Sequence, residues 1–227
     1  MISLASLIHV ERIFDSYGLA GLVLAATSFG QAAAGPLTSR WMGRWGMRPV
    51  INLTLAVSIV SMAAIAFLAM PLWGYMLFGL IGGLATPPIQ PAVRTIYPKM
   101  VTSKQLVPLF SLDASAQEII WVMGPVITTV LAIQVSPPVA IIVAGVFLIV
   151  GGVWFVSSPE LGSVRIPPNK GRIGRVLTKP PVLLATVTGF LLIGAAAAVE
   201  VAVVSVFGET GPQAGAVLAL WAIASLI

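Results

Sequence analysis

Three carboxylates occupy positions at which an acid could carry protons or hold a polar solute. Glu200 lies inside the apolar run 181–206, roughly 9 Å of helix rise before the run ends. An acid in the middle of a membrane helix costs about 2.5–3.5 kcal/mol, so its side chain should face protein or a water-filled path. We expect Glu200 either to bind a proton or solute in such a path, or to be a structural acid hydrogen-bonded to a neighbouring helix.

Asp113 and Glu118 stand near the start of another apolar run, residues 111–135. On a helix Asp113 shares a face with Gln117, whereas Glu118 lies on nearly the opposite face. Glu118 is the deeper of the two acids, and it either lines a cavity or has a structural role. The helix dipole favours an acid in the first turns. For Asp113 we therefore predict an ion pair at the inner boundary with one of three arginines: Arg94, Arg40 or Arg44.

Other reactive groups are scarce. The absence of cysteine excludes a disulfide framework, a thiolate metal site and a redox nucleophile. His9 is the single histidine, and its charged neighbours indicate a solvated loop residue rather than a proton relay. With scattered acids and one histidine, an intramembrane enzyme is the weaker interpretation, and the missing G-x-x-x-x-G-K-[ST] pattern argues against an ATP-driven pump. We expect no cofactor and no bound metal.

The composition requires these side chains to be held by elements that face lipid. Charged residues make up 8% of the 227 positions, against about 25% in soluble domains. Hydrophobic residues reach 58% and the mean hydropathy is +1.04. The net charge of +5 would fit a nucleic-acid partner, but the basic residues fall in short loops and form no face. We therefore expect a monomer in contact with membrane lipid and with no nucleic acid.

The apolar runs predict an all-α membrane protein with six complete and two partial transmembrane helices, because roughly 20 apolar residues cross the hydrocarbon. The complete spans are 17–37, 49–69, 72–92, 111–135, 137–156 and 181–206. The partial spans are 1–10, which is too short, and 213–227, which has no terminator.

Basic residues set the orientation. Eleven of the twelve fall in loops 38–48, 93–105 and 158–180. The bias of lysine and arginine towards the inner side places these three loops in the cytoplasm and the protein in the plasma membrane.

Prolines interrupt two spans. Pro87, Pro88 and Pro91 each remove a backbone donor near Arg94. The span 72–92, which is the fourth when the partial run 1–10 is counted as the first, should therefore bend in its cytoplasmic half. The bend is either a gate or a kink that neighbouring helices tolerate. The pair Gly124-Pro125 predicts a similar break, with close helix packing at the glycine as the alternative.

A short internal repeat suggests two parallel halves. Residues 15–25 and 209–219 align without a gap, 194 positions apart, with five identities. The alignment predicts a first helix that begins about 13 residues before Met1, and a complete chain on the order of 400 residues, clipped here at both ends. The expected organisation is a bundle over 1–157, a central loop over 158–180 and the start of a second bundle over 181–227.

The loop after the second span carries a motif that resembles that of the major facilitator superfamily of secondary transporters. The first part of the family's pattern is matched by Gly35, Leu37 and Arg40. After about four extra residues, its last part is matched by Arg44, Gly46 and Arg48. The family's acid is replaced, by Ser39 or Gly43 in alternative alignments, which removes the latch that it implies. Gly124-Pro125 matches part of a second family motif, on the fifth helix.

The resemblance implies two six-helix bundles that rock about a midplane site and move a small solute, with proton coupling expected. A non-transporting membrane scaffold or inactive fragment is the alternative, and an intramembrane enzyme is the third.

Overall fold

The computed structural model describes residues 2–163, 179–189, 191–192 and 195. The chain divides into two compact units, Met1–Asn169 and Lys170–Ile227. Nearly all of the described residues belong to the first unit. In the second, the description covers the short apolar helix Pro180–Gly189, so the predicted span 181–206 is covered only in part. Glu200 and the second copy of the repeat lie outside the described residues.

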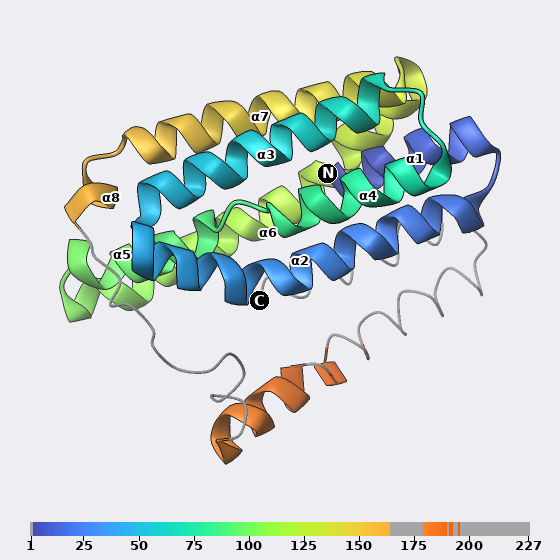
Figure 1. Cartoon of the computed structure of the whole chain (residues 1–227). Coiled ribbons are helices and arrows are strands. Elements are labelled where there is room, and N and C mark those ends of the chain that lie inside the picture. The colour runs from blue at the N-terminus through green and yellow to red at the C-terminus, as the bar shows by residue number, and fades with distance from the viewer. Residues whose placement is uncertain (1, 164–178, 190, 193–194, 196–227) are drawn as a thin grey trace. The chain divides into compact units, whose positions relative to one another are not determined.

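The first unit is built from helices alone over the residues that the structure describes (Figure 1). They are α1 (Ile2–Phe14), α2 (Tyr17–Trp45), α3 (Met47–Phe67), α4 (Leu72–Leu84), α5 (Ile89–Met100), α6 (Ser103–Gln134), α7 (Pro137–Ser157) and α8 (Glu160–Ser163). Five segments are long and apolar enough to cross a membrane: α2, α3, α4 with α5, α6 and α7. The all-α prediction is confirmed over the described residues, and five of the predicted spans coincide with helical segments of sufficient length and apolar composition.

Consecutive long helices of the bundle alternate in direction, so α2 and α4 run parallel to each other (Figure 1). Helix α2 lies along α4, α3 lies along both α4 and α7, and α1 contacts α2, α6 and α7 (Figure 1). One apolar core lies where α1 meets the start of α2 and α4, around Val10, Val23 and Tyr75. A second core lies at the other end, around Ile51 and Ile96. Elsewhere large apolar side chains cover the surface, as expected for helices in lipid.

Two of the predicted cytoplasmic loops are largely helical. Helix α2 continues to Trp45, and Gly46 alone separates it from α3. Likewise, only Val101 and Thr102 separate α5 from α6. The predicted loop boundaries 38–48 and 93–105 are therefore wrong, because a helix ends where its hydrogen bonds and packing end and not where hydropathy falls. Met42, for example, is buried one turn beyond the apolar run.

The two proline predictions have opposite outcomes. The fourth span is broken between α4 and α5, at residues 85–88, as Pro87 and Pro88 predicted. Helix α6, by contrast, runs without a break through Pro125, so the predicted break there is wrong. Two adjacent prolines remove two successive backbone donors, whereas an isolated proline removes only one.

His9 is buried and not solvated. It lies within α1, which stays helical to Phe14, and is 9% exposed. Its ring meets that of Tyr75 on α4 at 66°, with the ring centroids 6.4 Å apart. The interpretation of His9 as a loop residue is therefore wrong, because the chain turns only at Asp15 and Ser16.

Candidate functional site

Helix α5 has two chemically different faces, and this difference organises the site. On one face Ala92 and Ile96 are buried against the corner where α2 meets α3. On the other, Gln90, Arg94 and Tyr97 follow one another at intervals of four and three residues and face α6. The short helix therefore joins the apolar core of the cytoplasmic end to a polar seam on α6.

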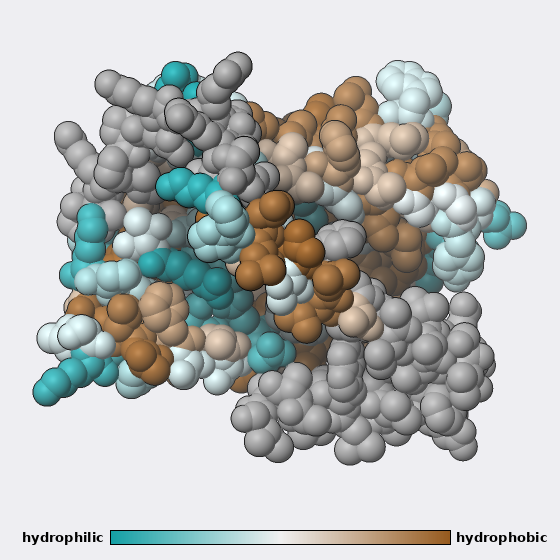
Figure 2. All heavy atoms as spheres, turned by 90° about the horizontal axis from the view of Figure 1, so that it is seen from below, coloured by the Kyte–Doolittle hydropathy of each residue, from teal (hydrophilic) through white to brown (hydrophobic). Residues whose placement is uncertain are grey.

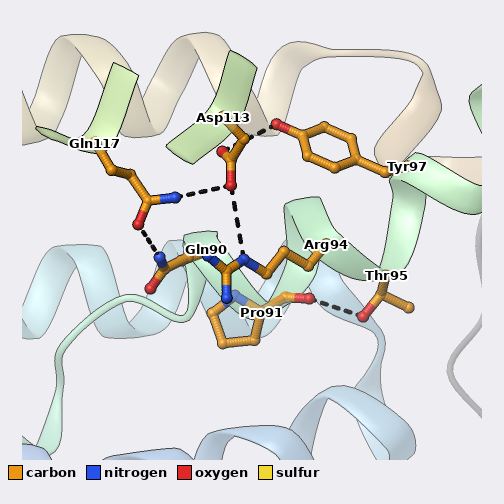
Figure 3. A network of polar contacts seen from close by, with 7 residues as sticks. All are labelled: Gln90, Pro91, Arg94, Thr95, Tyr97, Asp113 and Gln117. Atoms are coloured by element: carbon orange, nitrogen blue, oxygen red, sulfur yellow. Dashed lines mark hydrogen bonds and ion pairs between the residues drawn. The ribbon is translucent and has the colours of Figure 1, made fainter. Parts of the chain in front are cut away.

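Asp113 is the centre of that seam (Figure 3). Its carboxylate accepts a hydrogen bond from the Tyr97 hydroxyl at 3.1 Å and another from Gln117 Nε2 at 2.7 Å. Arg94 Nε lies 3.6 Å from the same carboxylate. The side chain of Asp113 is 16% exposed and that of Arg94 is 51% exposed, so the acid is well enclosed while its cation is half in solvent.

Gln117 extends the network back to α5. Its Oε1 accepts a hydrogen bond from Gln90 Nε2, so the seam is tied at Gln90 as well as at Arg94 and Tyr97. The ring of Tyr97 also meets Phe110 on α6 edge to face, with centroids 5.6 Å apart and an interplanar angle of 74°. Thr95, drawn in Figure 3, takes no part, because its hydroxyl donates to the carbonyl of Pro91 within α5.

The structure realises one of the three predicted ion pairs of Asp113, the pair with Arg94. Gln90 and Tyr97 were missed in the sequence analysis. Their spacing from Arg94 was a usable signal, since residues at i, i+4 and i+7 lie on one helix face. The partner helix was not readable from that spacing.

The seam lies directly after the break between α4 and α5. Pro87 and Pro88 cannot donate to the carbonyls of Gly83 and Leu84, so the α4 ladder stops there. Other hydrogen bonds replace the missing ones and give the break a defined shape. The hydroxyl and the amide of Thr86 both donate to the carbonyl of Gly83, at 2.8 and 3.1 Å. The joint is therefore short and ordered, with a helix on each side.

Helix α4 itself is fixed to α2 through glycine. A Cβ atom added to Gly83 would lie 2.2 Å from the carbonyl oxygen of Thr27, and one added to Gly30 would lie 2.4 Å from that of Leu80. Only glycine lets two helix backbones approach this closely. The α2–α4 seam, defined by these glycines, therefore behaves as one rigid body up to the break.

The loop-motif residues gather at the corner between α2 and α3. Gly46 has φ of +89° and donates its N–H to the carbonyl of Met42 at 3.0 Å, which permits the one-residue turn. Arg48, at the start of α3, donates through Nη2 to the carbonyl of Ser158 at 2.9 Å. Arg44 is exposed and Arg40 is half-buried. In the surface view hydrophilic residues gather towards the end of the first unit where α5 lies (Figure 2).

The remaining predicted residues stand apart from the seam. Gly35 is exposed, and a Cβ there would meet nothing within 4 Å, so packing in the described residues does not explain this glycine. Glu118 is half-buried, and no hydrogen bond or ion pair joins it to another described residue. Gly124 is buried, and its carbonyl accepts the hydroxyl of Thr128 at 2.8 Å. No cluster of histidine, aspartate and glutamate that could hold a metal ion occurs among the residues described.

Residues 1–227 match the family model described as Major Facilitator Superfamily. The match spans both compact units and confirms the resemblance inferred from the motif residues. No curated protein and no solved structure matches the chain.

Proposed function

Because this chain belongs to the major facilitator superfamily of membrane transporters, we propose that it moves a small hydrophilic or amphipathic solute by alternating access. In this proposal α5 is the gate at the basic end of the first unit. The observation that supports it most directly is the break at residues 85–88, followed by a helix whose polar face is tied to α6.

The gate has a fixed side and a releasable side. The α2–α4 seam brings backbones too close together for one helix to slide past the other. Beyond the break, α5 is held to α6 by a few polar contacts, and the ion pair among them is half exposed on its arginine side. Exposed ion pairs are worth about 0.2–1 kcal/mol, so breaking the Arg94–Asp113 pair adds little to the cost of moving α5. A gate needs this combination of rigid support and weak latch.

This polar seam would also take the role of the acid that the loop motif lacks. In the family pattern that acid holds the loop to neighbouring helix ends, and here Ser39 or Gly43 stands in its place. We propose that Asp113, with Arg94, supplies a latch at the same end of the bundle from different helices.

Proton coupling through Glu200 is the proposed energy source, with Glu118 as a second candidate. An acid in the middle of an apolar run must face protein or water. Glu118 has no partner in the described part of the first unit. The proposed location is the plasma membrane, with the basic corner at Arg40, Arg44 and Arg48 and the α5–α6 end in the cytoplasm, because basic residues favour that side.

A cross-link between α5 and α6 tests the gate. The chain has no cysteine, so the double variant Gln90→Cys/Gln117→Cys carries the only two thiols. The variant is reconstituted in proteoliposomes with a trapped pH dye, a panel of small solutes is added, and a short bifunctional thiol reagent follows. We expect the solute-dependent pH change of the double variant to stop on cross-linking. Each single-cysteine variant should keep its pH change under the same treatment.

Three other outcomes would contradict the proposal. Transport that continues after complete cross-linking would remove α5 as the gate. Absence of flux for every solute before cross-linking would favour a membrane scaffold. Chemical conversion of a solute without any gradient would favour an intramembrane enzyme.

A further inference from the structure

A second feature of the first unit is a partly polar pocket beside the α4–α5 break, whose residues Thr86 and Pro87 belong to its lining. It lies among α1, α2, α3 and α4 and has a volume of about 180 Å³. Apolar side chains such as Phe78 and Leu148 form part of its wall. Its polar lining consists of Ser6, Thr27, Gln31, Ser58, Ser61 and Thr86.

The pocket has a buried floor and an open mouth. Ser61, Ser58 and Ser6 are 2%, 5% and 8% exposed, so the three serines form the floor. Gln31 and Thr86 are exposed and mark the mouth. Ser61 lies six residues before the end of α3, roughly 9 Å of helix rise inside the bundle. The floor is thus well within the hydrocarbon depth of the spans.

Three of the hydroxyls have already committed their protons to the backbone. Ser58, Thr27 and Thr86 each donate to a main-chain oxygen. The accepting carbonyls belong to Ala85, Val23 and Gly83, at 2.8, 2.9 and 2.8 Å respectively. A hydroxyl that donates in this way still offers two lone pairs. These three side chains therefore present acceptors to the pocket.

The other three polar groups have no protein partner. No hydrogen bond joins Ser6, Gln31 or Ser61 to another residue in the described part of the chain. Two of these side chains are more than nine-tenths buried and line the pocket. A hydroxyl at this depth requires a hydrogen-bonding partner, and the pocket that these side chains line can hold one.

The chemistry of the lining defines the occupant. Among the described residues that line the pocket, none is charged and none is a histidine, so an ion bound there would lack a counter-charge from them. Acceptors outnumber donors, which favours an occupant rich in O–H groups. The space of about 180 Å³ has room for several water molecules or for one small organic molecule. A three-carbon triol is one such small organic molecule.

We propose that this pocket binds a small uncharged polyol, with Ser61 and Ser6 as its principal contacts. The described lining comes from the first unit alone, and binding to it can be measured without transport. A cluster of water molecules has the same hydrogen-bonding chemistry, and the experiment separates the two sources.

The test is saturation-transfer difference NMR on the whole chain in nanodiscs, with glycerol as the probe and glycerate as its charged counterpart. We expect a saturable signal for glycerol and none for glycerate. Ser61→Val fills the floor and should abolish the glycerol signal. Ser6→Ala removes one hydroxyl without filling space and should weaken binding about 2- to 10-fold, as for one hydrogen bond. Ser115→Ala on α6, whose exposed hydroxyl donates only to Ser111, is the matched control and should bind as the wild type does.

Each other result overturns the proposal. The absence of a glycerol signal in the wild type would mean that water alone fills the pocket. Equal signals in the wild type, Ser61→Val and Ser6→Ala would place the glycerol elsewhere. A stronger signal for glycerate would mean a charged ligand. Because the readout is binding, none of these results bears on whether the chain transports a solute.

Discussion

Replacing Gly83 with alanine tests whether α2 and α4 form one rigid body. The Cβ atom of the alanine would lie 2.2 Å from the carbonyl oxygen of Thr27 and 3.1 Å from the backbone nitrogen of Gln31. Both obstacles belong to the backbone of α2, so no rotamer change relieves them. The two helices must separate by roughly 1 Å to restore an ordinary contact distance.

The expected cost follows from two opposing terms. Overpacking a tight interior costs about 1–3 kcal/mol, and the upper end applies because the backbone itself must move. Alanine in place of glycine returns about 1 kcal/mol of helix propensity. The net loss in the free energy of unfolding should therefore be about 2 kcal/mol, or roughly 30-fold in the unfolding equilibrium.

The chain supplies graded controls for this substitution. Gly74→Ala meets the Cβ atom of Met70 at 2.9 Å. Met70 lies in the link before α4 and not in a packed helix, so the cost should fall between those of the open positions and of Gly83→Ala. Gly21→Ala in α2 and Gly151→Ala in α7 meet nothing within 4 Å, so the propensity term alone applies and each should stabilise by up to about 1 kcal/mol. The predicted order of stability is Gly21→Ala above Gly74→Ala above Gly83→Ala.

Unfolding by sodium dodecyl sulfate, followed by the fluorescence of the six tryptophans, measures this order in mixed micelles. The wild type and all four variants are compared at the same lipid and detergent composition. If Gly83→Ala proves as stable as Gly21→Ala, the helices are not in backbone contact, and the rigid side of the proposed gate is lost.

Two further predictions concern the acids. Asp113→Asn keeps an acceptor for Tyr97 but loses the pairing with half-exposed Arg94, so its unfolding free energy should fall by at most about 1 kcal/mol. Asp113→Leu also leaves its hydrogen-bond donors unpaired and should cost about 1–3 kcal/mol; equal losses in the same unfolding assay would mean that the network contributes nothing beyond charge. Glu200→Gln should abolish proton-coupled transport in proteoliposomes, while Glu11→Gln, outside the long apolar runs, should leave it intact. Unchanged flux and pH dependence in Glu200→Gln would exclude that acid from coupling.

Hydropathy located the spans well and their ends poorly. The predicted span 137–156 differs from α7 by one residue at its end, because apolar composition and helix coincide there. Helix α2, in contrast, continues to Trp45, eight residues beyond the predicted end at Leu37. Its last turns combine arginines with buried Thr38 and Met42, and a mixed composition of this kind has no hydropathy signal although it packs as a helix.

The candidate site was predictable from the sequence only where residues close together in the chain indicate it. Asp113 in the first turns of an apolar run implied a cationic partner, and the choice among three arginines needed the fold. The triplet of Gln90, Arg94 and Tyr97 on one helix face was readable from its spacing, but Pro91 within it belongs to the group of prolines that predicted a bend. Since α5 is held by tertiary contacts on both faces, propensity alone underestimates it.

The polar pocket could not be predicted from any single segment of the sequence. Ser6, Ser61 and Gln31 stand on three different helices, and each is unexceptional within its own apolar run. A single hydroxyl in a membrane helix usually donates to a carbonyl one turn earlier, as Thr27, Thr38 and Thr54 do here. Ser6 and Ser61 make no such bond, and that difference is visible only once the helices are assembled. Serine and threonine side chains that do not donate to the carbonyl one turn earlier are therefore the first candidates for ligand contacts within the first unit.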